Sequence, residues 1–239
     1  AIEVIGWITR QPWCSGAATV SHGLLTAWHV DGRGPQLVAV SMRQPGVSVR
    51  GGSWQAVGMS GSASPDVAFD DAHAELVGQP GDYLSRPGFS QGGAGIAACW
   101  HGGAIFIASV LHSAVAKAHA SANPSTLPFS RAALGRIDTD LAASAALLRE
   151  SAQWIDAHPR HDASTLALRV RLRAECAARL VLDGAGAALG ATPFCRDARF
   201  ARMAADLPVF IRQSHGERDF AALGERVAAA AAARAGWAL

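Results

Sequence analysis

The stretch Asp183–Asp219, DGAGAALGATPFCRDARFARMAADLPVFIRQSHGERD, combines a glycine step with a helical pattern of charges. Its charged residues recur at spacings of three or four and would share one face of a helix: Arg196, Arg199, Arg202 and Asp206. Its small and aromatic residues would form another face against a partner helix: Phe194, Ala198, Ala201 and Ala205. We therefore expect this stretch to bind or position another group.

Gly184 and Gly186 open this stretch and lack side chains that would hold a neighbour at a distance. Such a step lets the backbone approach either another helix or the phosphates of a ligand. Close helix packing is the more common use of isolated glycines in a helical pattern. Both readings stay open at this point.

Upstream of the stretch, the chain changes its periodicity near Gly88. Residues 1–87 hold short apolar runs separated by turn signals such as Asp31-Gly32 and Pro45-Gly46, which predict strands. Residues 88–239 predict helices over about 90–118, 130–158 and 163–189, with Asp162 as an N-cap, then one after Pro193 and a last one over 218–235. Pro208 is expected to interrupt the region between the last two.

The predicted fold class is therefore α+β, with one domain on each side of this change. Residues 1–87 would form a small β-sheet or barrel domain, and residues 88–239 an antiparallel α-helical bundle of the four-helix type.

Composition narrows the function classes. Of 239 residues half are apolar and 17% are charged, as in a globular protein, and a formal charge of +2 gives no argument for nucleic acid or an anionic membrane. We find no window apolar enough to span a bilayer, and expect a cytoplasmic protein. The four cysteines show no metal-binding or redox spacing, so we expect no metal site and buried thiols: Cys14, Cys99, Cys176 and Cys195.

One alternative is a trypsin-type protease, because WCSGAATVSHGLLTAWHV resembles strands that deliver a catalytic histidine, here His29. The best serine, Ser60, follows His29 too closely to leave room for the second barrel that such enzymes need. The following residues predict helices, so we interpret His29 as a strand histidine near a turn.

Three motifs, in order along the chain, resemble the acyl-CoA dehydrogenase superfamily of flavoproteins. Pro12-Trp13-Cys14-Ser15-Gly16 is similar to the Trp-Ile-(Ser/Thr)-Asn-Gly strand end, and residues 57–71, VGMSGSASPDVAFDD, to its Gly-Met-Arg-Gly-Ser strand. Gly184-Ala-Gly186 followed by Arg196-Asp197-Ala198 is similar to Gly-Gly-x-Gly…Arg-Asp-Ala. The resemblance implies that Trp13 packs near the flavin of FAD, that Ser15 bonds its N5 edge beside Gly16, and that Gly184 and Gly186 approach FAD between subunits.

The chain also departs from the family pattern. Counterparts of the N-terminal helical domain and of the Thr-Glu-Pro loop are absent, HASANPSTLPFSR lacks the arginine of Arg-x-x-Phe-Gly, and the Tyr-Glu-Gly-Thr segment with the glutamate base is missing. By position, the base would be His215, with Asp206 as the second choice. A histidine there resembles the flavin monooxygenase branch; the alternative is a surface histidine at a helix start.

The resemblance implies a FAD-dependent oxidoreductase that dehydrogenates an acyl-CoA-like thioester, or a related flavin monooxygenase, assembled as a homodimer or homotetramer. The alternative is a degenerate relative without catalysis that serves as a structural or partner-binding subunit. Retention of Trp13, Ser15 and the glycine step favours the enzyme, and the missing motifs favour the alternative.

Overall fold

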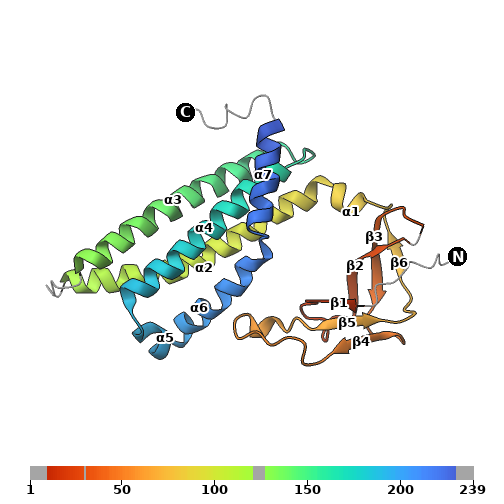
Figure 1. Cartoon of the computed structure of the whole chain (residues 1–239), viewed down its shortest axis with the longest axis horizontal. Helices are drawn as coiled ribbons and strands as arrows, with labels where there is room; N and C mark the ends of the chain where they lie inside the picture. Colours follow the sequence, from red (N-terminus) through yellow and green to blue (C-terminus); the bar gives the residue numbers. More distant parts are fainter. Residues whose placement is uncertain (1–9, 30, 121–126, 230–239) are drawn as a thin grey trace. The chain divides into compact units, whose positions relative to one another are not determined.

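The computed structural model describes residues 10–29, 31–120 and 127–229. The chain divides into two compact units, Ala1–Phe89 and Ser90–Leu239. The first contains the strands and the second contains most of the helical residues, so the predicted α+β class is confirmed (Figure 1).

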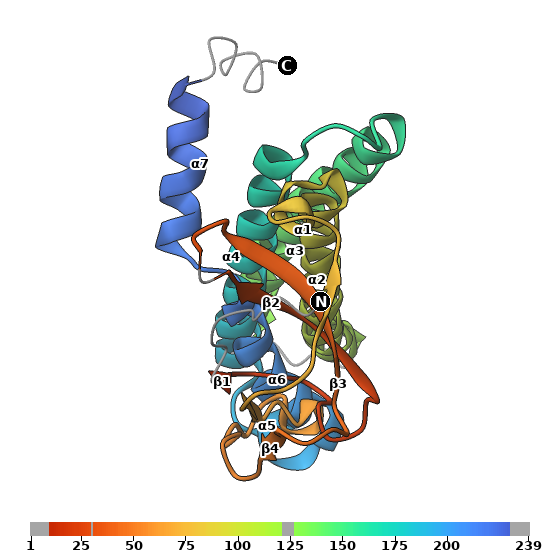
Figure 2. The same cartoon turned by 90° about the vertical axis from the view of Figure 1, so that its right-hand side faces the viewer.

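The first unit holds two three-stranded antiparallel sheets (Figures 1 and 2). One has the order β1-β5-β4, formed by Arg10–Gln11, Asp66–Phe69 and Val47–Arg50. The other has the order β2-β3-β6, formed by His22–Trp28, Pro35–Ser41 and Glu75–Val77. Two short helices complete the unit, η1 (Ser60–Ser62) and α1 (Asp82–Ser85).

Period-two burial shapes the second of these sheets. Val38 and Val40 of β3 are buried with Ala27 of β2, because alternate strand residues point to one face. The polar Gln36 is also buried, and its amide donates to the carbonyls of Val77 and Gly78 at 3.0 and 2.8 Å. His29 directly follows β2, with Nε2 3.4 Å from the Gln36 side-chain oxygen. It is thus a buried histidine beside a strand end.

Three long helices dominate the second unit, and Figure 1 shows them side by side. They are α2 (Pro87–Ala120), α3 (Leu127–Ala157) and α4 (Ser164–Leu189). Shorter elements follow: α5 (Thr192–Arg196), α6 (Ala198–Phe210), η2 (Ile211–Gln213) and α7 (Glu217–Ala229). Their shared core includes Trp100, Ile107, Ile137, Val181 and Phe200.

The face on which α6 packs differs from the expected one. Phe200, Leu207 and Ile211 are about 1% exposed and point into the core, whereas Ala198 is exposed. Burial of a large apolar side chain releases more free energy than burial of an alanine, so the large side chains decide which side of α6 faces the core. The predicted alanine face is therefore wrong.

Two helix-end predictions also need correction. Asp162 precedes the N-cap position by one residue, and its carboxylate accepts the Ser164 backbone N–H at 2.9 Å. Pro208 lies inside α6, which continues to Phe210. At the start of α6, Asp197 is the N-cap and accepts the N–H groups of Arg199 and Phe200 at 3.0 Å.

The prediction that no stretch is apolar enough to span a bilayer is wrong for α2. By length and composition α2 could cross a membrane, since an 18-residue window has a mean hydropathy of 1.6. The helix contributes Trp100, Ile107 and Leu111 to the core of the second unit. Core helices of this kind pass the same test, so α2 is weak evidence for a membrane span.

The prediction of buried thiols is wrong as well. Cys99, Cys176 and Cys195 are exposed and Cys14 is half-buried. Cys99 is next to the buried Trp100, and Cys176 is next to the buried Glu175. Because neighbouring residues of a helix point in different directions, both cysteines face solvent. Burial raises the pKa of the Cys14 thiol.

His101 of α2 provides a prediction on acid stability. It is 8% exposed, and burial together with the charge of Arg149 lowers the pKa of His101 from its usual 6.5. The unfolded chain therefore binds this proton more readily, and the free energy of unfolding should fall as the pH drops below about 6.5. Urea unfolding at about pH 7.5 and about pH 5 measures this loss.

His101→Gln should make the loss of stability on acidification smaller than in the unmodified protein. His112→Gln is the matched control, because His112 is exposed on the same helix. An equally steep loss in His101→Gln would show that other groups cause it.

Candidate functional site

Two of the sequence motifs meet in the first unit. The turn from Trp13 to Gly16 lies against the segment from Met59 to Pro65. The Cys14 N–H donates to the Pro65 carbonyl at 2.9 Å, and the Gly16 N–H lies 3.3 Å from the carbonyls of both Ser62 and Ala63. The fold thus joins two segments that lie about fifty residues apart.

Three serine hydroxyls form a chain across this contact. The Ser15 and Ser64 oxygens are 2.7 Å apart, and those of Ser64 and Ser62 are 2.8 Å apart. Ser62 also reaches the Met59 carbonyl at 2.8 Å. Since each hydroxyl can donate or accept, the three hydroxyls can reorient to form a hydrogen bond with a polar group placed against them. The sequence predicts a flavin contact for Ser15 alone. For Ser62 and Ser64 the only signal in the sequence is their Ser-x-Ser spacing.

Backbone strain concentrates in the same contact. Trp13, Met59 and Ala63 have φ values of 58°, 57° and 39°, in the left-handed region that non-glycine residues rarely occupy. Each such residue costs on the order of 1–3 kcal/mol and persists where the surroundings force it, often at functional sites. Trp13 is also 77% exposed, so the strained turn leaves a large aromatic ring in contact with solvent.

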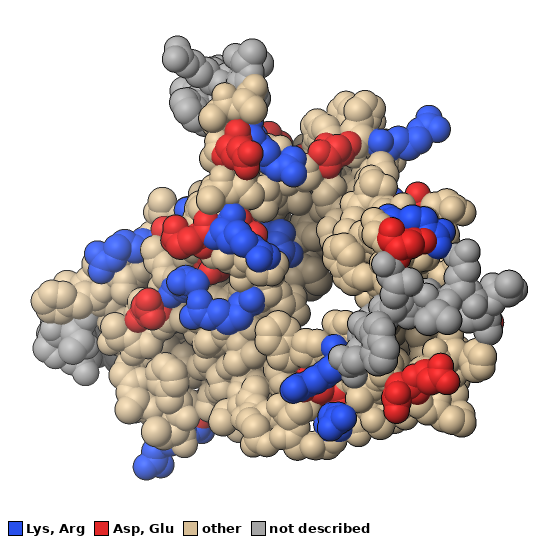
Figure 3. Space-filling model, turned by 45° about the vertical axis from the view of Figure 1, so that its right-hand side comes forward, with Lys and Arg blue, Asp and Glu red and all other residues tan. Residues whose placement is uncertain are grey.

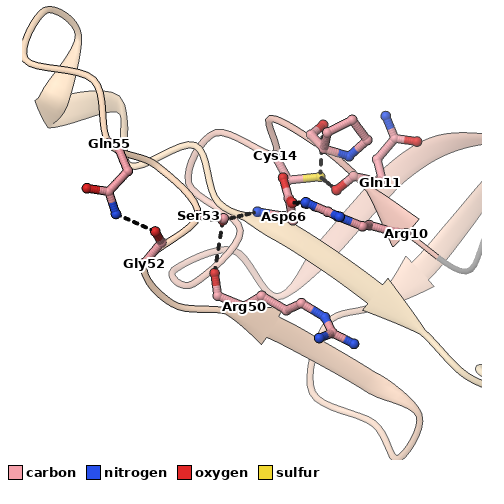
Figure 4. Close-up of polar contacts among 9 residues, drawn as sticks. Arg10, Gln11, Cys14, Arg50, Gly52, Ser53, Gln55 and Asp66 are labelled. Carbon is pink, nitrogen blue, oxygen red and sulfur yellow. Dashed lines mark hydrogen bonds and ion pairs between the residues drawn. The ribbon is translucent and has the colours of Figure 1, made fainter.

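Strand β5 begins directly after this contact, and Figure 4 shows the polar contacts around its first residue, Asp66. Asp66 at its start is buried and forms an ion pair with Arg10 of β1, whose Nε lies 2.6 Å from the carboxylate. The Asp66 N–H donates to the Ser53 hydroxyl at 2.8 Å. The Cys14 thiol lies 3.4 Å from the Gln11 carbonyl. These bonds fix the strand ends on which the Trp13 turn rests.

A second cluster surrounds His215, in the turn between η2 and α7. Asp219, one helical turn later, accepts the His215 backbone N–H at 3.1 Å, and its other oxygen lies 3.4 Å from Nδ1. The Asp219 side chain is 13% exposed and that of His215 is 57% exposed. An acid facing Nδ1 favours the proton there, which leaves Nε2 as the acceptor. This is the arrangement of a general base and its orienting acid.

Asp206, the second candidate base, is held differently. It lies on α6, and its carboxylate accepts from Arg202 Nε at 3.0 Å. The ion pair with Arg202 already engages the Asp206 carboxylate, so Asp206 is the weaker candidate for the base. Asp219 follows His215 by four residues, and this spacing is visible in the sequence.

Gly184 and Gly186 lie in α4 against apolar side chains. A Cβ at Gly184 would lie 3.4 Å from Ile137 Cδ1, and one at Gly186 would lie 3.3 Å from Phe194 Cζ. Both glycines thus serve close packing, the first of the two uses expected. Gly184 also lines a hollow of about 680 Å³ between α3 and α4, whose wall includes Phe129, Arg136 and Asp183.

On the face shown in Figure 3, basic and acidic side chains are interspersed over both units. Among residues 10–29, 31–120 and 127–229, no three His, Cys, Asp or Glu side chains gather as metal ligands would.

Comparison with known proteins adds evidence on the fold. No protein-family profile matches the chain, and no curated protein matches it significantly. Among solved structures, an acyl-CoA dehydrogenase from Geobacillus kaustophilus superposes with a TM-score of 0.78 at 16% identity, over 91% of this chain and 60% of that one. The chain shares the acyl-CoA dehydrogenase fold.

Two further solved structures resemble the chain in fold. The 3-HSA hydroxylase from Rhodococcus sp. RHA1 gives a TM-score of 0.70 at 19% identity, over 90% of this chain and 62% of that one. XiaF from Streptomyces sp., solved with FADH2 and glycerol, gives 0.57 at 21%, over 85% and 58%. The chain thus spans about 60% of the length of the structures that it matches.

Proposed function

We propose that this chain is a flavin-dependent oxidoreductase that uses FAD. The observation that carries the proposal is the strained, exposed Trp13 beside the hydroxyls of Ser15, Ser64 and Ser62, in a chain with the acyl-CoA dehydrogenase fold. An aromatic plane can cover the flavin ring, and a hydroxyl that donates or accepts suits its polar edge. These residues therefore fit a flavin, which when bound supplies the hydride acceptor.

His215 is proposed as the general base. Its Nε2 would take a proton from the substrate carbon, while Asp219 holds the ring by Nδ1 and stabilises the imidazolium that forms. The ion pair of Asp206 with Arg202 makes that carboxylate the weaker candidate.

The substrate is proposed to be an acyl-CoA-like thioester, dehydrogenated between its α and β carbons. The similarity to a hydroxylase as well as to dehydrogenases keeps a related monooxygenase reaction as the second form of the same proposal. Anaerobic mixing with acyl-CoA thioesters separates the two, because only a dehydrogenase bleaches its flavin with the thioester alone.

We also propose a cytoplasmic homodimer or homotetramer, which light scattering tests.

Trp13→Ala should weaken FAD binding about tenfold, because an aromatic contact of this kind contributes about 0.5–1.5 kcal/mol beyond the area that it buries. The measurement is a fluorescence titration of the chain with FAD. Trp28→Ala is the matched control, since Trp28 is 62% exposed on the other sheet. Equal affinity for FAD in the Trp13 and Trp28 variants would show that Trp13 does not contact the flavin.

The second candidate function is a subunit without catalysis that binds a partner. The packing of Gly186 against Phe194 favours it, because a backbone covered by an aromatic ring is less open to a phosphate. If the visible absorption spectrum of the purified chain is the same before and after incubation with FAD and removal of free cofactor, this function is supported over the enzyme.

A further inference from the structure

Arg171 of α4 connects the interior of the bundle to the turn that carries His215. Its Nη2 donates to the Gln213 carbonyl at 2.8 Å, immediately before the turn. Its Nη1 donates to the Gly93 carbonyl of α2 at 3.2 Å. One guanidinium thus holds two segments more than a hundred residues apart in the chain.

The guanidinium is itself held in place. Its carbon lies 4.8 Å from the centre of the Trp100 ring, and Trp100 is fully buried. The Trp100 ring also meets Phe210, the last residue of α6, edge to face at 6.3 Å. Arg171 therefore has a fixed position relative to the end of α6 and the turn that follows.

Two acids act on Arg171. Burial lowers the pKa of Arg171, while the charges of Asp219 and Glu175 act against this shift. Asp219 is the residue that holds the ring and the backbone N–H of His215. Arg171 is thus linked to the His215 turn through the Gln213 carbonyl, and the charge of Asp219 also acts on it.

We propose that Arg171 is the positioning residue of the His215 turn, which it holds by the Gln213 carbonyl while Gly93 and Trp100 fix its own position. The catalytic meaning of this role rests on the proposed function, whereas the positioning itself does not. Arg171 is proposed to act through the Gln213 carbonyl.

The first test is amide hydrogen exchange at His215 in the full chain. Arg171→Met keeps an unbranched, largely aliphatic side chain but removes the guanidinium, with its charge, both donors and its contact with Trp100. It should accelerate exchange of the His215 N–H about tenfold, as expected when a hydrogen bond is weakened by about 1.4 kcal/mol. Arg212→Met, at an exposed arginine in the same segment, should leave exchange unchanged.

The second test is kinetic. Arg171→Met should lower the rate of flavin reduction about 10- to 100-fold, as a misplaced catalytic group does, with FAD affinity unchanged. Arg171→Lys should recover part of this rate, because lysine keeps the charge and one donor. The double variant with Asp219→Asn should lose little more than the single variants, since both act through one turn.

Unchanged exchange at His215 in both Arg171 variants would overturn the proposal, and so would full additivity of Arg171→Met and Asp219→Asn. Should Arg171→Met fail to fold, Arg171→Lys with its intermediate exchange rate provides the comparison. Accelerated exchange in a chain whose flavin is never reduced would keep the positioning role and reject the proposed function.

Discussion

His215→Ala is expected to slow flavin reduction about 10²- to 10⁴-fold while FAD still binds. The reason is that alanine removes the proton acceptor, while Trp13 and Ser15 remain in place to bind the flavin. Stopped-flow absorbance under anaerobic conditions measures the reduction, and a titration with FAD measures the affinity.

Two further variants make this result specific. Asp219→Asn should produce a smaller loss than His215→Ala, because the imidazole remains but its orienting charge is gone. His112→Ala, on the exposed side of α2, should react like the unmodified protein. An unchanged rate in His215→Ala with a large loss in Asp206→Asn would transfer the role of base to Asp206.

Phe200→Ala should lower the free energy of unfolding by about 3–5 kcal/mol, the usual cost of deleting a buried phenylalanine. Phe200 is 1% exposed, lies in the main core of the helical unit and meets Phe194 edge to face at 5.0 Å. Its loss would leave a cavity between α6 and the long helices. Urea unfolding followed by circular dichroism measures the change.

The matched control is Phe129→Ala, because Phe129 is 79% exposed. Its unfolding free energy should stay within about 0.5 kcal/mol of the unmodified value, as for most surface changes. Similar losses in the two variants would contradict the core assigned to α6.

The long helices could be predicted from the sequence because their signals are local. Periodicity and breakers predicted helices over 130–158 and 163–189, and the structure has Leu127–Ala157 and Ser164–Leu189. Asp162 was correctly linked to the start of α4, but the cap position was off by one residue. Caps and breakers act over a few residues, so a sequence pattern contains most of the information needed.

Features that depend on tertiary contacts were harder to predict. The side of α6 that faces the core is set by Phe200 and Leu207 meeting the bundle, and the alanine pattern suggested another side. The use of Gly184 depends on Ile137, which is far away in the sequence. Apolarity alone likewise does not tell whether α2, of whose most apolar window 44% is buried, is a core helix or a membrane span.

The candidate site was predicted in part. Trp13, Ser15 and His215 were chosen from motifs, and the structure adds the partners that give them a chemical context: Ser64 for Ser15, and Asp219 for His215. Arg171 had no sequence signal of its own. Its role depends on the Gln213 carbonyl, and backbone acceptors are invisible in a list of residue types.

The most direct test of the central claim is the visible absorption spectrum of the purified chain after incubation with FAD and removal of free cofactor. A flavin-dependent oxidoreductase should retain an absorption band near about 450 nm, since that band belongs to the bound isoalloxazine ring. The band should be weaker in Trp13→Ala and unaltered in Trp28→Ala. A colourless protein that fails to retain FAD would contradict the account and support a subunit without catalysis.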